Sequence, residues 1–189
     1  MIRLPEDLNC LTCQNRPAIF DALTPEQLRK ISDNRIIVKY KANETVTKQN
    51  SPASHTFCVR KGIAKQFIEG PDGKNIILKI LKPSDYVGIT SILSDSTFRF
   101  SVSTIDDSYF CFTDNAIMKE LIESNIEFSN RINIALTDML TRYFDKIIDL
   151  TQKQMPGRIA VALLYLYEEI YKDDGFDIFV TRQELSERT

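Results

Sequence analysis

The hydrophobic period of this chain changes once, near Asn115, and no other feature of the sequence constrains the fold as strongly. Before that point, short runs of β-branched and aromatic residues are separated by turn residues. After it, apolar residues recur every three to four positions. A period of two indicates strands, and a period near three and a half indicates helices. The sequence therefore predicts an α+β protein in which the sheets come first and the long helices follow.

Six short runs before Asn115 have the composition of strands. Two of them flank residues 69–73, a Glu-Gly-Pro-Asp-Gly segment that is typical of a hairpin connection. Many short strands at regular spacing favour a sandwich or barrel over a parallel sheet with crossover helices. The six runs cover residues 35–40, 55–60, 63–68, 75–81, 101–105 and 108–112.

Helices are expected on both sides of the β region. Thr24 precedes a proline and has Gln27 three residues later, which is the pattern of a capped helix N-terminus. A long helix is expected over residues 129–153, and the proline and glycine at 156–157 should break it. An apolar helix is expected next, over residues 158–171.

Apolar residues of the long predicted helix form a heptad-like stripe, which Lys146 interrupts. Such a stripe is typical of a helix that pairs with an identical helix. The alternative is one amphipathic helix packed on its own β domain. Ile134, Phe144 and Ile148 form a second apolar face, so the helix could do both. The predicted dimer stripe consists of Ile132, Leu136, Met139, Tyr143 and Leu150.

The composition excludes several classes of protein. Hydrophobic residues make up 43% and charged residues 26% of the chain, which is ordinary for a globular protein. The sequence holds no apolar run of the roughly 20 residues that span a bilayer, and its first seven residues hold a proline and acids where a signal peptide is apolar. We therefore expect a cytoplasmic protein without a membrane partner. The net charge of −2 gives no overall attraction to nucleic acid, so DNA binding would need a local surface.

The cysteines suggest metal or redox chemistry at one end of the chain. Cys10 and Cys13 form a Cys-x-x-Cys pair, which in a cytoplasmic protein indicates a metal or redox site. Cys58 and Cys111 each lie in an apolar strand, where free cysteine is usually a small buried hydrophobe. His55 is the only histidine and there is no second Cys-x-x-Cys, which argues against a closed structural zinc site.

The order of these parts resembles the Crp/Fnr family of bacterial transcription regulators, over nearly the whole chain. Residues 176–186 are similar to the short strand and first helix of that family's helix-turn-helix. Residues 60–62 resemble its strand-turn glycine, residues 81–88 its phosphate-loop region, and residues 156–160 its hinge and the helix after it.

This resemblance implies a fold and a division into domains. The sensor would be a double-stranded β-helix, a jelly-roll-like β-roll with an N-terminal helix, over residues 1–128. A dimerisation helix would cover residues 129–155, and residues 156–189 would begin a winged helix-turn-helix. The recognition helix would follow Thr189, so we expect a natural chain that continues further. The chain as given should then be unable to bind its operator specifically.

The resemblance also places DNA contacts at Thr181, Arg182 and Gln183, at the start of the first helix of the helix-turn-helix. A helix N-terminus with an adjacent arginine attracts phosphate, which positions a protein on DNA without reading its sequence. The alternative is plain helix capping, because Thr181 and Glu184 have the spacing of a capping box.

Departures from the family pattern bear on the effector. Ile89 stands where members that bind cyclic nucleotides have a glutamate that binds the ribose. Tyr143 and Phe144 stand where members that bind cyclic AMP have small hydroxyl residues, so their rings would fill the adenine site. We therefore do not expect cyclic AMP. The effector pocket that the resemblance implies comprises Val87, Gly88, Ile89, Thr90, Arg99, Phe100, Ser101, Tyr143 and Phe144.

Three turns also depart from the pattern, since Asn43, Asn50 and Ser84 replace glycines that are usual in the family. Asparagine tolerates left-handed backbone better than most residues, so the roll should survive these replacements.

Cys10, Cys13 and Cys111 resemble three of the four ligands by which oxygen-sensing members hold an iron–sulfur cluster. The third N-terminal cysteine of those members would fall near Ile19, which cannot bind iron. Cys58 could be the fourth ligand if the β-roll brings it beside the N-terminal segment, since such a cluster needs four thiolates. Direct thiol chemistry and haem, with His55 as an axial ligand, are the other cofactor hypotheses.

The resemblance implies a homodimeric transcription regulator that responds to an effector or redox signal and acts on promoter DNA, with RNA polymerase as a further partner. The alternative is a ligand-binding β-roll module that acts through protein partners without DNA. We do not expect an enzyme, because the sequence has one histidine, no nucleophile elbow and no glycine-rich phosphate loop.

Overall fold

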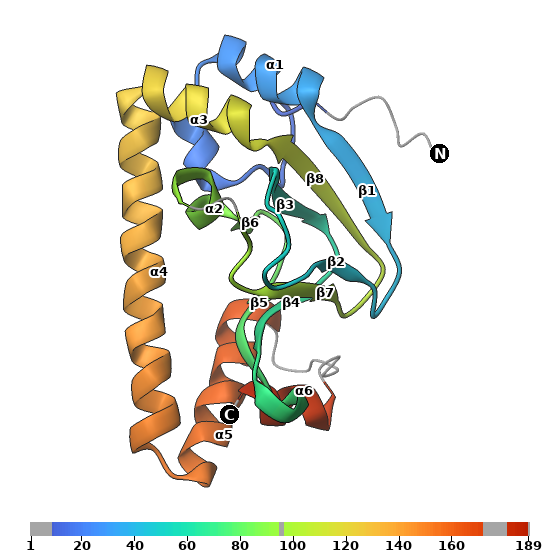
Figure 1. Ribbon diagram of the computed structural model, residues 1–189, viewed down its shortest axis with the longest axis vertical. Coiled ribbons are helices and arrows are strands. Elements are labelled where there is room, and N and C mark those ends of the chain that lie inside the picture. The colour runs from blue at the N-terminus through green and yellow to red at the C-terminus, as the bar shows by residue number, and fades with distance from the viewer. Residues whose placement is uncertain (1–8, 95–96, 172–180, 189) are drawn as a thin grey trace.

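The computed structural model describes residues 9–94, 97–171 and 181–188. Two four-stranded antiparallel sheets form a roll, with strand orders β1-β8-β3-β6 and β2-β7-β4-β5. Helices α1 and α3 lie over one end of the roll, and the long helix α4 runs down its side (Figure 1). The predicted α+β roll architecture is confirmed. The strands are β1 Ile36–Tyr40, β2 Thr45–Thr47, β3 His55–Lys61, β4 Ala64–Glu69, β5 Asn75–Leu81, β6 Tyr86–Val87, β7 Ser101–Thr104 and β8 Ser108–Asp114.

All six predicted strands are present, and so is the hairpin between β4 and β5, whose connection contains the short 3₁₀ turn η2 (Pro71–Gly73). The sequence prediction missed β2 and β6. These strands have three and two residues, which is too short for alternation to show.

The tight turns of the roll need left-handed backbone, and the predicted residues provide it. Asn43, Asn50 and Ser84 have φ angles of 65°, 64° and 78°. Gly62 has a φ of +89°, and a Cβ atom there would lie 2.3 Å from the Ser108 hydroxyl oxygen. No side chain fits at that turn.

The interior of the roll is filled by aromatic side chains. Phe57 of β3 packs edge-on against Phe110 of β8, with 5.7 Å between ring centroids, and it also contacts Phe112 and Phe98. Burying side chains of this size is the main favourable contribution to folding here. The buried cluster comprises Ala53, Phe57, Val59, Ala64, Leu81, Val87, Phe98, Phe100, Val102 and Phe110.

A second core joins the helices to the outside of the roll. Thr24 caps α1 as predicted: its hydroxyl oxygen accepts from the backbone of Gln27, and the Gln27 side chain accepts from the backbone of Thr24. Phe128 and Ile132, near the start of α4, are buried in this core. The elements that form it are η1 (Ala18–Ala22), α1 (Pro25–Asn34), α2 (Ile89–Leu93), α3 (Asn115–Ser124) and the first turns of α4 (Ile126–Gln152).

The break after α4 differs from the prediction. The chain leaves the helix at Lys153 and Gln154, and Pro156 and Gly157 lie inside the first turn of α5 (Met155–Tyr165). A proline is favoured in the first turn because its missing N–H would have no partner there. The proline therefore marks the start of the second helix rather than the end of the first. After α5 the helix continues in wider π-type turns over Leu166–Tyr171.

The last described element, α6 (Arg182–Arg188), has the predicted capping box. The Glu184 N–H donates to the Thr181 hydroxyl, and the Thr181 N–H donates to the Glu184 carboxylate. Glu184 also pairs with Lys65 of β4 at 2.7 Å, so α6 packs on the β4–β5 hairpin. The extended segment predicted at 176–180 lies outside the described residues. Among the described helices, none has the length and apolar content needed to cross a membrane.

Candidate functional site: a four-cysteine pocket

Alternation along β3 and β8 gives these two strands two different faces. Phe57 and Phe110 point into the roll. The residues next to them, Cys58 and Cys111, therefore point outward, because successive side chains of a strand face opposite sides. Cys58 and Cys111 are direct partners in the antiparallel ladder. The sequence context suggested that both cysteines are core residues. The phenylalanines beside them fill the core instead, and the cysteines line a pocket.

The N-terminal segment covers the side of this pocket that lies opposite the sheet. The Asn15 side chain donates to the Arg60 carbonyl of β3 at 2.8 Å. The Cys10 N–H donates to the Ser32 hydroxyl of α1 at 3.3 Å, and Arg16 donates to the Cys10 carbonyl at 3.2 Å. These bonds hold the Cys-x-x-Cys segment against the outer face of the sheet.

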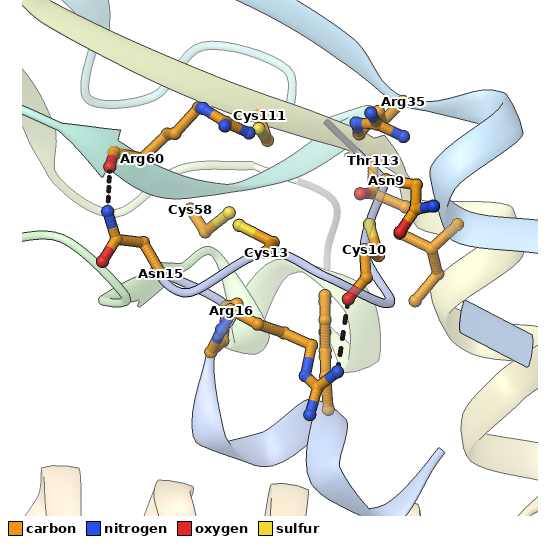
Figure 2. A pocket seen from close by; sticks show the side chains of 13 residues that line it. Asn9, Cys10, Cys13, Asn15, Arg16, Arg35, Cys58, Arg60, Cys111 and Thr113 are labelled. Atoms are coloured by element: carbon orange, nitrogen blue, oxygen red, sulfur yellow. Dashed lines mark hydrogen bonds between the residues drawn. The ribbon is translucent and has the colours of Figure 1, made fainter. Parts of the chain in front are cut away.

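All four cysteines, which are free thiols, line this single pocket. The sulfur atoms of Cys13 and Cys58 point toward each other, and Cys111 lies beside the Arg60 side chain (Figure 2). The pocket encloses about 380 Å³, part of it open to solvent. The structure therefore meets the condition set for Cys58, which lies beside the N-terminal segment. Its full lining is Asn9, Cys10, Cys13, Asn15, Arg16, Pro17, Phe20, Ile31, Arg35, Cys58, Arg60, Cys111 and Thr113.

The two cross-strand thiols have different acidities. The neighbouring Cys58 thiol, acting as a hydrogen-bond donor, and then the charges of Arg60 and Arg35 lower the pKa of the Cys111 thiol to about 7, against the effect of burial. The same hydrogen bond, together with burial, raises the pKa of Cys58 well above its usual value. Burial also raises the pKa of Cys10. Near neutral pH, Cys111 is thus the thiol of this pair that ionises, and thiolates are the reactive form of cysteine.

Sequence reasoning did not identify the arginines of the pocket. Arg60 follows Cys58 by two residues on β3 and therefore shares its face. Arg35 lies between α1 and β1, and its guanidinium donates to the Ser32 carbonyl and hydroxyl oxygens. Arg16 pairs with Asp21 at 2.7 Å. The period-two offset from the phenylalanines was the signal that could have placed Arg60 beside the thiols.

A single metal ion does not fit this arrangement, whereas the iron–sulfur cluster inferred from the sequence stays a prediction. Within the described part of the chain, no three histidine, cysteine or acidic side chains lie close enough together to hold a metal ion. Ile19, at the position of the absent cysteine, packs against the helical core. His55 shares a hydrogen bond with Ser54 at 2.9 Å and does not line the pocket, so haem ligation at His55 gains no support either.

The residues predicted to form an effector pocket lie in several environments. Val87 and Phe100 are buried in the roll interior. Gly88, with a φ of 97°, begins α2, where Ile89 and Thr90 are half-buried. Arg99 is exposed.

Ser101, another residue of the predicted effector pocket, is already hydrogen-bonded within the chain. The Ser101 hydroxyl donates to Glu69 and accepts from the Gln49 N–H at 2.8 Å. Neither of the two described pockets contains a residue of the predicted effector set. The effector pocket at these positions stays a prediction.

The predicted dimer stripe faces the chain's own domain. Ile132 is 1% exposed and Leu136 packs on the same helical core. Met139, Tyr143 and Leu150 are half-buried on this side of the helix. Ile132 is therefore not available to a partner, because it is buried against the chain's own domain, as the alternative prediction for this helix stated. Phe144, predicted for the effector pocket, is 56% exposed on the other face.

The DNA-contact prediction at the last helix stays a prediction. Thr181 and Gln183 are exposed. The Thr181 hydroxyl is engaged in the capping box, and Gln183 donates to Glu187 at 3.2 Å. The Arg182 side chain lies outside the described part of the structure, so its contact with DNA also stays a prediction.

Comparison with known proteins identifies the fold. Residues 37–125 match the family model of the cyclic nucleotide-binding domain. The CRP-like cAMP-activated global transcriptional regulator of Mycobacterium tuberculosis is 26% identical over 166 residues, covering 88% of this chain and 74% of that protein. The cAMP-activated global transcriptional regulator CRP of Escherichia coli is 26% identical over 161 residues, covering 80% of this chain and 74% of the relative.

A solved structure from Eubacterium rectale, described as a transcriptional regulator of the Crp/Fnr family, superposes with a TM-score of 0.75. It is 19% identical, and the match covers 90% of this chain and 79% of that one. The chain has the fold of the Crp/Fnr regulators.

These matches confirm the resemblance to the Crp/Fnr family that was drawn from the sequence. The relatives are transcriptional regulators, which favours that function over a β-roll module that acts only through protein partners. Their names specify cAMP as the activator, whereas the chain described here has a phenylalanine-filled roll and a pocket of thiols and arginines.

Proposed function

We propose that this protein is a DNA-binding transcription regulator that works as a homodimer and responds to a signal received by its β-roll domain. The observation that carries the proposal is the long helix α4, which is buried in the β domain at its start and exposes an apolar face along the rest. A helix built in this way can receive a change in the sensor and pass it to a partner.

The apolar face of α4 supports pairing through that helix. Five large side chains on it are more than half exposed, which is costly in a monomer and typical of an interaction surface. Phe144 and Ile148 are one helical turn apart and share this face. The exposed fractions are 57% for Ile134, 51% for Leu140, 56% for Phe144, 56% for Ile147 and 51% for Ile148.

The proposed mechanism is a population shift between two arrangements of α4 and α5. Phe20 and the start of α4 share one core, and Phe20 also lines the cysteine pocket. A change in the pocket would therefore alter the packing at the base of α4. The break at residues 153–154 would then let α5 and the DNA-binding part take a new angle.

The signal is either a small effector or a redox change. The geometry favours the pocket of thiols and arginines as its point of entry over the positions where a cyclic nucleotide would bind. The proposal includes no catalytic step, in keeping with relatives that are transcriptional regulators. RNA polymerase is a further partner in this proposal.

Selection from a random pool of DNA duplexes tests the proposal, with the protein produced from its natural gene. We expect enrichment of an inverted repeat whose half-sites lie about one duplex turn apart. A matched selection with Phe144→Asp should lose the enrichment because the dimer is lost. Failure of the unmodified dimer to enrich any sequence would contradict the proposal and favour a module that acts through protein partners.

A further inference from the structure

We propose that Cys58 and Cys111 form a modification site that a hydroperoxide oxidises to an intramolecular disulfide. This inference concerns the thiols alone and holds whether or not the chain binds DNA. It rests on the cross-strand placement of the two cysteines, on the arginines around them, and on the opening of the pocket to solvent.

The backbone already has the geometry that a disulfide needs. Cys58 and Cys111 are direct partners in the β3–β8 ladder. Direct partners in antiparallel strands have Cα atoms about 4.5–5.5 Å apart. Disulfides join residues whose Cα atoms are about 4.4–6.8 Å apart. The Cys58 and Cys111 side chains lie on the same face of the sheet, so the disulfide can form without moving either strand.

The surroundings of the pair make Cys111 the attacking thiolate. The neighbouring Cys58 thiol and then the charges of Arg60 and Arg35 lower the pKa of the Cys111 thiol, and the Arg60 side chain lies beside it (Figure 2). Cys111 is only partly buried, whereas Cys58 is 9% exposed. Thiolates at positive, partly open positions are those that peroxides oxidise selectively. Cys58, its direct partner in the ladder, is the resolving thiol.

The reaction balances with the hydroperoxide as the only co-reactant. The Cys111 thiolate attacks the terminal peroxide oxygen, the O–O bond breaks, and the departing oxygen takes a proton to leave as alcohol, or as water from hydrogen peroxide. Cys111 is then a sulfenic acid. The Cys58 sulfur attacks the Cys111 sulfur, the S–O bond breaks, and hydroxide leaves with the Cys58 proton as water. Two thiols lose two electrons, and the peroxide gains them.

The other two cysteines are poorer candidates for the first step. Cys10 is held by the bond from its N–H to Ser32, and burial raises the pKa of its thiol. Cys13 lies on the N-terminal segment beside Cys58 (Figure 2), and it has no strand register that fixes its distance to Cys111.

Thiol counting and peptide mapping test the proposal directly. The full chain, reduced and then freed of reductant without oxygen, is treated with one equivalent of hydrogen peroxide. Ellman's reagent in denaturant should find four thiols before treatment and two afterwards. Mass spectrometry of the unreduced digest should show the peptide of Cys58 linked to that of Cys111. A linkage through Cys10 or Cys13, or four remaining thiols, would overturn the assignment.

Single variants separate the two roles. Cys111→Ser should slow peroxide consumption at least about tenfold, down to the rate of the unfolded chain. Cys58→Ser should consume peroxide but stop at a sulfenic acid, which dimedone traps on Cys111. Cys13→Ser serves as the matched control and should still form the disulfide. If Cys58→Ser fails to fold, the mapping of the unmodified chain decides alone.

Arg60→Met provides a readout that does not depend on any cysteine substitution. Loss of this guanidinium should raise the pKa of Cys111 and therefore move the pH midpoint of the peroxide reaction upward. The reaction at neutral pH should then be slower. Iron and zinc analysis of the protein as purified completes the test. Stoichiometric metal that protects Cys58 and Cys111 from peroxide would overturn the proposal, whereas a metal-free protein that forms the disulfide supports it.

Discussion

The side-chain amide of Asn125 donates a hydrogen bond to the side-chain oxygen of Gln27, with 2.9 Å between the two atoms. Asn125 caps α4, and its oxygen accepts from the Phe128 N–H at 3.0 Å. Gln27 belongs to the capping box of α1. One hydrogen bond therefore joins the starts of two helices that lie about a hundred residues apart in the chain.

This junction predicts the effect of removing the cap. Asn125→Ala should lower the free energy of unfolding by about 1–2 kcal/mol, since the cap and its buried partners are lost together. Urea unfolding followed by circular dichroism measures the change. Asn130→Ala, the same substitution at an exposed position inside α4, is the control and should change stability little. Equal effects of the two substitutions would contradict the structural role of Asn125.

The exposed face of α4 predicts the oligomeric state. The unmodified chain should sediment as a dimer at micromolar concentration, and Phe144→Asp or Ile148→Asp should give monomers, because a carboxylate cannot be buried unpaired in an apolar interface. Arg142→Asp changes an exposed position outside the apolar face and should leave the dimer intact. A monomer in the unmodified protein would contradict the pairing that we propose.

Two glycines predict opposite responses to the same substitution. At Gly62, alanine would adopt a φ of +89° and place its Cβ 2.3 Å from the Ser108 hydroxyl oxygen. Gly62→Ala should therefore destabilise the fold by about 1–3 kcal/mol. At Gly157, in the first turn of α5, the nearest atom is 3.8 Å from the added Cβ. Gly157→Ala should be neutral or stabilising by up to about 1 kcal/mol. The midpoints of urea unfolding of the two variants, each compared with that of the unmodified chain, measure both effects.

Lys146 predicts a rise in stability at alkaline pH. Burial, then the nearby Arg188, lower the pKa of Lys146 to about 8. An unfolded lysine titrates near pH 10.4, about two units higher, so between these values the unfolded state binds more protons and the free energy of unfolding rises with pH. The difference in stability between the unmodified chain and Lys146→Met should therefore shift in favour of lysine over this range.

Unfolding of both chains at pH values from about 7 to 10 checks the sign of this linkage. Lys119→Met, at an exposed position on α3, controls for the removal of one positive charge. Parallel stability curves for the unmodified chain and Lys146→Met would contradict the burial of the Lys146 ammonium group.

Local signals in the sequence predicted most of the fold. The capping boxes at Thr24 and Thr181 involve residues three positions apart, so the chain itself specifies them. The left-handed turns at Asn43, Asn50 and Ser84 are local as well. The two missed strands are short, and their pairing with β7 and β3 depends on distant parts of the chain.

The site was harder to predict because its residues meet only through tertiary structure. Cys13 and Cys111 come from segments about a hundred positions apart, and no spacing rule joins them. The apolar neighbours of Cys58 were a misleading signal: hydrophobic flanks indicate that a strand is buried, but they do not tell which of its faces a given residue occupies. The helix stripe predicted for a partner shows a related difficulty, because the chain's own core covers its first two residues, Ile132 and Leu136.

The shared strands β3 and β8 also restrict how this protein can change over time. Their phenylalanines build the roll on one side while their cysteines line the pocket on the other. Inserting or deleting a single residue in β8 would exchange these sides, because the side-chain period of a strand is two. Cys111 would then enter the interior, and Phe110 would face the arginines. Insertions are therefore excluded here, and the thiol site can be altered only by replacing side chains one at a time.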